Sequence, residues 1–98
     1  MITVVRTYII QQGKHQEAIE KATKAAAHAN ETYPAQARVV RNINGPDNQL
    51  HYVVDWESLA MWEASKAKGT EDAKLLALFA ELGALCEGQT INLYQTVS

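Results

Sequence analysis

The chain has 98 residues, a length that fits one domain spanning 1–98. Hydrophobic residues make up 47% of it and charged residues 20%, a globular composition that excludes intrinsic disorder. The formal net charge of −2 leaves no basic surplus, so we expect no nucleic-acid partner. The single cysteine, Cys86, excludes an internal disulfide and predicts a reducing, cytoplasmic location.

Hydropathy predicts neither a membrane span nor a signal peptide. The most apolar stretch, Leu75 to Cys86, contains Glu81 and is shorter than the roughly 20 residues that a bilayer requires. Met1 to Gln12 carries Arg6 inside its apolar run, which is typical of a strand and not of a leader. We therefore expect no membrane partner.

The first third of the chain predicts a strand followed by a helix. Residues 2–10 are rich in β-branched and aromatic side chains, which predicts a strand. From His15 to about Thr32, alanines recur at helical spacing and form a stripe that lets a helix pack closely. The helix should end at Tyr33, because the residue before a proline disfavours the α conformation. The stripe consists of Ala18, Ala22, Ala25 and Ala29.

The middle of the chain predicts a hairpin and a second helix. Ala37 to Ile43 and Leu50 to Trp56 have strand composition, and the turn-forming residues 44–48 between them predict an antiparallel hairpin. A helix is expected from Leu59 to Lys68, with Ser58 as its N-cap and Gly69 as its break.

The last third predicts a further helical piece and a final strand. We expect Thr70 to cap the helical piece and Gly88 to lie just past its end. The final strand is expected from Thr90 to Val97. The resulting order, β-α-β-β-α-β, predicts a ferredoxin-like α+β fold with two helices on one face of an antiparallel four-stranded sheet. The buried stripe of the helical piece should comprise Leu75, Leu78, Phe79, Leu82 and Leu85.

The predicted strands carry apolar side chains on both faces. The neighbours Val4 and Val5, and likewise Val53 and Val54, must point to opposite sides of the sheet. Two helices cover only one side, so the other side should expose an apolar patch unless a partner covers it. A second copy of the sheet, related by a two-fold axis, is the simplest cover, which predicts a homodimer through the non-helical face.

Two short motifs resemble known families. Arg6-Thr7-Tyr8 followed by Gly13-Lys14 resembles the opening of NIPSNAP-type domains, and Tyr52 to Ser58 resembles the "W-E-S" passage of antibiotic biosynthesis monooxygenase domains. Both families are dimeric α/β barrels, in which two ferredoxin-like subunits pack sheet against sheet. The resemblance implies a ligand cavity in each subunit between the sheet and the helices.

The resemblance to the monooxygenases also implies site residues. A tryptophan of their active site matches Trp56, and an aromatic residue six positions later matches Trp62. Tyr52 stands where those enzymes have an asparagine, and Arg6 stands where the related haem-degrading enzymes have one. The helical histidine of the haem-degrading enzymes is absent as well, so we expect no haem degradation.

The residues themselves point to a cavity for a flat anion. Arg6 and Tyr8 share one face of the first strand, where the guanidinium could hold a ligand anion or pair with Glu57, Glu63 or an acidic residue of the other subunit. Tyr52 and Trp56 share a face of the third strand and, with Trp62, could form an aromatic wall or simply pack in the core. The candidate ligand-binding residues are Arg6, Tyr8, Tyr52, Trp56 and Trp62.

No metal or cofactor site is predicted. His51 and Asp55 share a strand face but lie roughly 13 Å apart at about 3.3 Å per residue, so they cannot hold one ion. No glycine-rich phosphate loop is present, and Ser58 has no histidine placed to activate it.

Three functions remain open. The chain could be a homodimer that binds a small aromatic or acyl molecule, a cofactor-independent monooxygenase acting on a phenol or hydroquinone, or a structural dimer whose cavity its own side chains fill. The lack of a clear general base favours the first over the second, because Tyr8 at an ordinary pKa near 10 is a poor base at neutral pH.

Overall fold

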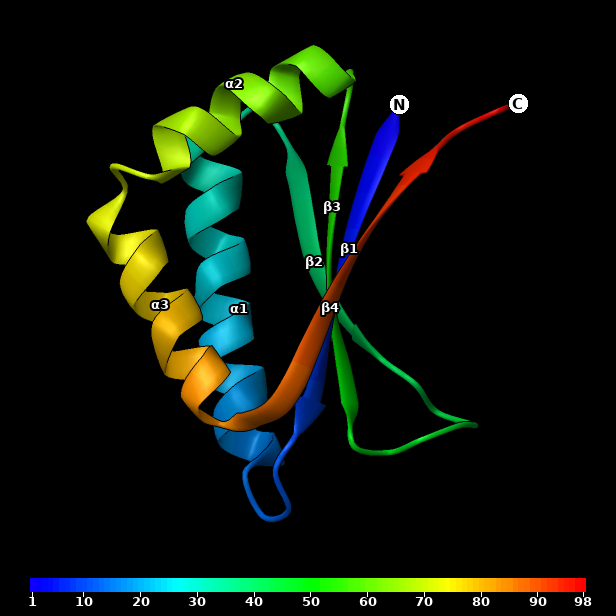
Figure 1. Cartoon of the computed structure of the whole chain (residues 1–98), viewed down its shortest axis with the longest axis vertical. Helices are drawn as coiled ribbons and strands as arrows, with labels where there is room; N and C mark the ends of the chain where they lie inside the picture. The colour runs from blue at the N-terminus through cyan, green and yellow to red at the C-terminus, as the bar shows by residue number, and fades with distance from the viewer.

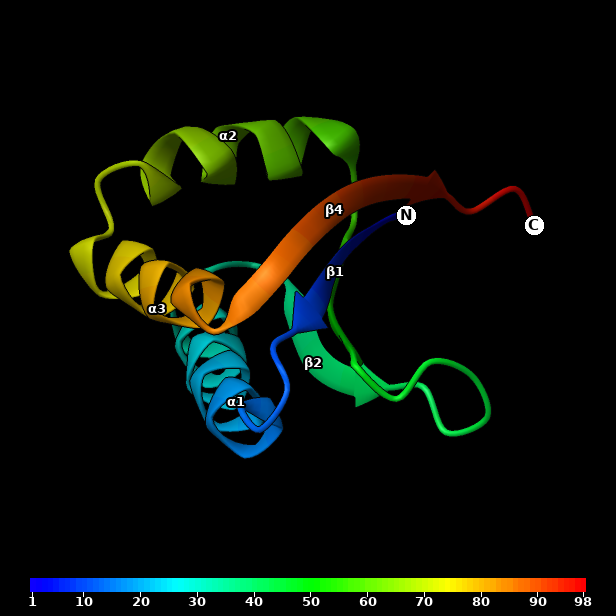
Figure 2. The same ribbon diagram turned by 60° about the horizontal axis from the view of Figure 1, so that its bottom comes forward.

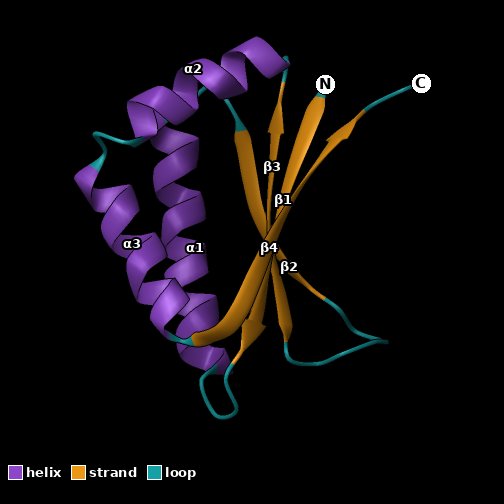
Figure 3. Cartoon of the chain, viewed as in Figure 1, coloured by secondary structure: helices purple, strands orange, loops and turns teal.

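A computed structural model describes all 98 residues as a layer of helices packed on one side of a sheet (Figures 1 and 3). The strands form one sheet in the order β2-β3-β1-β4, and every neighbouring pair is antiparallel. The predicted ferredoxin-like α+β fold is confirmed. In chain order the elements are β1 (Ile2–Ile10), α1 (His15–Thr32), β2 (Gln36–Arg41), β3 (Gln49–Trp56), α2 (Leu59–Gly69), α3 (Ala73–Ala84) and β4 (Cys86–Gln95).

Alternation along the central strand decides which side chains meet the helices. In β1, the even-numbered residues Val4 and Tyr8 are buried under the helical layer, whereas Val5 and Ile9 point to the open face. The prediction of strands with apolar residues on both faces is therefore confirmed. The β1–α1 turn is closed by Gly13, whose φ of 82° is a conformation that suits glycine.

The open face of the sheet is more polar than the sequence predicted. Thr3 Oγ1 donates to Asp55 Oδ1 at 2.7 Å, and Arg38 Nη1 donates to Asp55 Oδ2 at 2.8 Å, forming a polar row across three strands. A second row joins Thr7 Oγ1 to His51 Nδ1 at 2.9 Å. The directly paired Val5 and Val53 lie between these two rows, whereas Val40 lies in the second row, opposite His51. The expected continuous apolar patch is thus divided into apolar strips.

The alanine stripe sets the distance between α1 and the sheet. Ala18, Ala22 and Ala25 are fully buried, as the helical spacing predicted. Small side chains allow the helix axis to approach the strands closely, and Tyr52 Oη reaches Ala25 O at 3.4 Å. Tyr33 is the C-cap of α1 and has extended backbone, in agreement with the expected end before Pro34.

The segment after β3 forms two helices, α2 and α3, and the N-cap of α3 lies two residues later than predicted. Ser58 caps α2 as predicted, because its Oγ accepts from Met61 N at 3.2 Å. The N-cap of α3, however, is Asp72 and not Thr70: Asp72 Oδ1 accepts from Leu75 N at 3.0 Å. Thr70 instead ends α2, and its hydroxyl donates to Ala67 O.

Strand β4 begins four residues earlier than expected. Cys86 pairs with Ile10, and Gly88 pairs with Ile9, so Gly88 lies inside the strand and does not end a helix. Pairing with β1 outweighs the weak strand propensity of this segment, at the expense of a register shift between Ile9 and Ile10. Strand β2 is also shorter than predicted and stops at Arg41.

The β2–β3 loop projects away from the helical layer (Figure 2).

No helix of the chain is both long enough and apolar enough to cross a bilayer.

Candidate functional site: an aromatic pocket with two cations

A pocket of about 230 Å³ lies between the sheet and the α2–α3 segment. Helices α1 and α3 approach the sheet at the end where β1 finishes, and α2 lies across the opposite end, where β1 begins (Figure 1). The pocket lies towards this second end, because its lining includes Val4 near the start of β1 and Trp56 at the end of β3. Its lining comprises Val4, Arg6, Ala29, Tyr33, Tyr52, Val54, Trp56, Trp62, Ser65, Lys66, Gly69, Thr70, Leu75, Leu76 and Phe79.

The sheet contributes one wall through side chains that share the helix-facing side. Arg6 on β1 lies directly opposite Tyr52 on β3, and Trp56 is on the same face of β3. Together with Trp62 from α2, four of the five predicted site residues thus line one pocket. The predicted sharing of a strand face by Tyr52 and Trp56 is what brings the aromatic side chains of β3 together.

Tyr8 is the predicted site residue that does not line the pocket. Its side chain is only 1% exposed and lies in the core. Tyr8 lies two residues after Arg6 on the same face of β1, near the end of the strand that α1 and α3 approach. Burial raises the pKa of the Tyr8 phenol, and the nearby Arg6 guanidinium offsets part of that effect.

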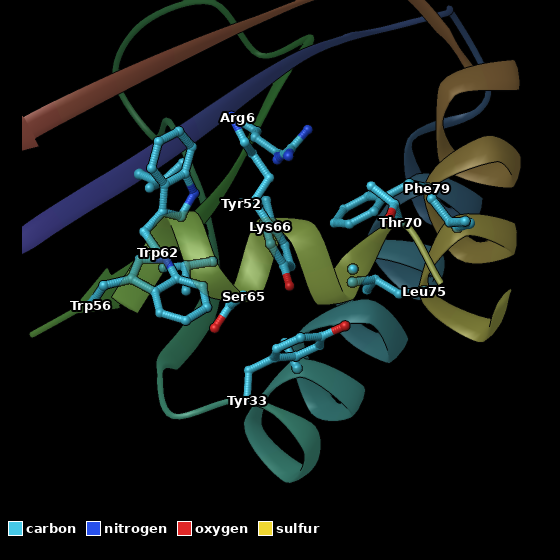
Figure 4. A pocket seen from close by; sticks show the side chains of 15 residues that line it. Arg6, Tyr33, Tyr52, Trp56, Trp62, Ser65, Lys66, Thr70, Leu75 and Phe79 are labelled. Carbon is cyan, nitrogen blue, oxygen red and sulfur yellow. The ribbon is translucent and has the colours of Figure 1, made fainter. Parts of the chain in front are cut away.

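Helices α1 and α3 supply two aromatic residues that the sequence analysis did not assign to the site. Tyr33 meets Trp56 edge to face at 6.5 Å between ring centroids, and Phe79 meets Tyr52 in the same way at 5.3 Å. Figure 4 shows these rings around the pocket. Their place could have been suspected from the sequence, since Phe79 is the only aromatic residue of the α3 stripe and Tyr33 ends the helix that packs on β3.

Both cations of the pocket rest on aromatic rings. The Arg6 guanidinium carbon lies 5.0 Å from the centroid of Phe79, and Lys66 Nζ lies 4.5 Å from the centroid of Trp62. Neither residue takes part in any of the four ion pairs of the chain. In particular, neither Glu57 nor Glu63 pairs with Arg6, so the structural pair within the chain does not form.

The pocket lining contains two cationic side chains and no Asp, Glu or His. This local positive charge contrasts with the net charge of −2 of the whole chain. An arginine in largely apolar surroundings is favourable only when an anion or a π system compensates its lost hydration. The pocket is therefore suited chemically to an anion that also offers a flat apolar surface.

A partly buried hydrogen-bond network supports the wall at the α1–α3 junction. Asp72 Oδ2 accepts from Tyr33 Oη at 2.7 Å and lies 2.8 Å from His28 Nε2. The hydrogen bond from Leu75 N, together with the contacts of His28 and Tyr33, lowers the pKa of Asp72 to about 2. Burial and the bond to this carboxylate raise the pKa of Tyr33 to about 12, which keeps its phenol protonated.

The pocket offers no general base for neutral pH. Burial raises the pKa of Tyr52 to about 12, so its hydroxyl also stays protonated. Of the histidines, His28 is engaged by Asp72 and His51 lies on the open face with Thr7. No three His, Cys, Asp or Glu side chains come together in a group that could hold a metal ion.

The fold and the pocket together define a ferredoxin-like α+β protein with a ligand-sized pocket between its sheet and its helices. Its fold is similar to that of a NIPSNAP domain protein from Burkholderia xenovorans, with 18% identity, a TM-score of 0.83, and 100% of this chain and 96% of that chain covered. A NIPSNAP family protein from Agrobacterium tumefaciens gives 21% identity and a TM-score of 0.77, with coverage of 98% and 85%.

A third similar structure is described as an antibiotic biosynthesis monooxygenase. It has 12% identity, a TM-score of 0.77, and 100% of both chains covered. The two families suggested by the short motifs are thus the families of the structural neighbours. No sequence-family model matches the chain, and no curated protein matches it either.

Proposed function

We propose that the chain, as a homodimer, binds a small aromatic or acyl anion in the pocket between its sheet and its helices. The observation that carries this proposal is the Arg6 guanidinium, which points into an aromatic pocket without a protein carboxylate beside it. An anionic ligand would supply the missing partner, and the surrounding rings would stack on or enclose its apolar part.

The size of the pocket favours a single substituted ring or a short acyl chain. A cavity of about 150 Å³ is known to admit benzene, so about 230 Å³ leaves space for a ring and a few further atoms. This empty space also counts against the alternative of a purely structural dimer whose own side chains fill the cavity.

Ligand binding can be followed by the intrinsic fluorescence of the protein. Both tryptophans of the chain, Trp56 and Trp62, line the pocket, so an occupant should change their emission. We expect benzoate to bind at least about tenfold more tightly than neutral benzamide, which has the same shape, because Arg6 compensates the charge. Hexanoate serves as the acyl probe.

The decisive variant is Arg6→Met, with Arg41→Met as its control on the exposed part of β2. Arg6→Met should abolish the preference for benzoate over benzamide and leave the free energy of unfolding within about 1 kcal/mol, because no buried carboxylate loses its partner. Absence of binding by both benzoate and hexanoate at millimolar concentration, or unchanged benzoate binding by Arg6→Met, would contradict the proposal.

A second candidate function is cofactor-independent oxidation of a hydroquinone-type substrate. The fold shared with a protein described as an antibiotic biosynthesis monooxygenase favours it, as does a pocket in which Arg6 could stabilise a substrate anion that gives an electron to oxygen. The lack of a base among the lining residues favours binding alone. Oxygen consumption with a hydroquinone, faster than its autoxidation and lost in Arg6→Met, would establish the oxidation.

A further inference from the structure

Resting on the proposed function, we infer that the pocket selects a single-ring aromatic diacid, with one anionic group held by Arg6 and the second by Lys66. The two cations belong to different walls: Arg6 projects from β1 and Lys66 from α2 (Figure 4). A ligand that satisfies both must carry an anionic group towards each wall.

Lys66, like Arg6, has an aromatic contact but no ion pair. Each cation contacts a ring of the pocket and no carboxylate, although the chain carries 11 acidic residues that could have paired with it. A cation–π contact at an exposed position contributes only about 0.5–1 kcal/mol, so a ligand carboxylate can replace it at little cost. Lys66 is therefore held at the pocket and remains available.

The pocket that the two cations share is lined by aromatic rings. Trp56 and Tyr33 form an edge-to-face pair within the same lining, and Trp62 lies beneath the Lys66 ammonium. Rings of this kind favour a flat ligand, and about 230 Å³ limits that ligand to one ring with small substituents. Two cations in one aromatic pocket are complementary to a benzene ring that carries two carboxylates.

Neighbouring Lys68 provides the matched control for Lys66. It lies on the same helix and also contacts a ring, with Nζ at 5.3 Å from the centroid of Tyr33, but it does not line the pocket. A general effect of positive charge on α2 would therefore involve both lysines, whereas a specific contact with the second carboxylate involves Lys66 alone.

The test compares terephthalate and isophthalate with monomethyl terephthalate, which has a similar ring and one charge fewer. Wild-type protein should bind the better diacid about fivefold more tightly than the monoester, the upper range for a pair at an exposed lysine. Lys66→Gln should remove this preference, because it should weaken diacid binding more than it weakens binding of the monoester or of benzoate, and Lys68→Gln should retain the preference. Thermal unfolding of each variant confirms that it is folded.

The outcomes separate this inference from the proposed function. Binding of benzoate and the monoester without any preference for either diacid, or a preference that survives Lys66→Gln, would overturn the diacid inference and leave the proposed anion site standing. Failure of benzoate, hexanoate and both diacids to bind would overturn the proposed function and this inference together.

Discussion

Asp72 connects three parts of the pocket wall with one carboxylate. It caps α3 through Leu75 N, accepts the Tyr33 hydroxyl from the end of α1, and contacts His28 one turn earlier on α1. The side chains of Asp72 and His28 are 12% and 14% exposed, so water cannot fully replace these bonds. Asp72 therefore fixes the position of Tyr33 and of α3, which both line the pocket.

Loss of this carboxylate should destabilise the protein. We expect Asp72→Ala to lower the free energy of unfolding by about 2–3 kcal/mol, since it removes a helix cap worth about 1 kcal/mol and leaves buried donors without an acceptor. Asp72→Asn retains a capping oxygen and should cost less. Urea denaturation at neutral pH measures both changes, and equal stability of wild type and Asp72→Ala would show that the network is unimportant.

The same carboxylate should make stability depend on pH in the acid range. Its pKa in the folded protein is about 2, below the ordinary value of 3.8, so folding is favoured by its ionised form. The stabilisation is complete above about pH 4 and is lost as the pH falls towards 2. Urea midpoints measured at pH 5, 4 and 3 should fall more steeply for wild type than for Asp72→Asn; parallel slopes would contradict this assignment.

At the residue scale, strand periodicity predicted the site better than residue chemistry did. Tyr52 and Trp56 lie together because alternate residues of a strand share a face, a rule that does not depend on tertiary context. The same rule placed Tyr8 with Arg6, but it cannot tell how far along the strand the pocket extends. Tyr33 and Phe79 reach the pocket through the packing of α1 and α3, which no local pattern in the sequence specifies.

At the element scale, the small alanine side chains of α1 determine how closely this helix packs. Its buried side carries alanines with 0% to 7% exposure, so Tyr52 of β3 reaches the helix backbone at Ala25 O. Interiors are packed at nearly crystalline density, and a larger side chain in such a contact forces the helix away from the sheet.

A matched pair of leucine substitutions tests the close packing of α1. Ala22→Leu should destabilise by about 1–3 kcal/mol because Ala22 is fully buried against its neighbours. Ala27→Leu, on the exposed side of the same helix, should change stability by less than about 0.5 kcal/mol. Similar melting temperatures for the two variants would show that the α1–sheet contact is loose enough to accept a larger residue.

The order of the elements could be predicted from the sequence, but some of their limits could not. Thr70 and Asp72 both have side chains that can cap the N-terminus of α3. Asp72 is the cap because it also bonds to Tyr33 and His28, which are distant in sequence. Likewise, β4 extends back to Cys86 because β1 offers it a pairing edge there. Long-range contacts thus decided the limits that local propensity left ambiguous.

At the scale of the whole molecule, the open face of the sheet is the surface most in need of a partner. The helices cover only one side (Figure 2). On the other side, apolar strips such as the Val5–Val53 pair lie between polar rows. The edge residues of this face, Val40 and Tyr94, are 41% and 57% exposed. A second copy packed face to face would bury these strips while the polar rows keep their bonds within each chain.

Sedimentation at micromolar concentration should therefore give twice the chain mass of 10.8 kDa. The double variant Val40→Glu with Tyr94→Glu should remain folded, because both side chains are exposed in the single chain, but it should sediment as a monomer since charges would be buried at the interface. Ile43→Glu, which adds a charge at a 92% exposed loop position, should stay dimeric. A monomeric wild type would refute dimerisation itself, whereas a dimeric double variant would place the interface on another surface.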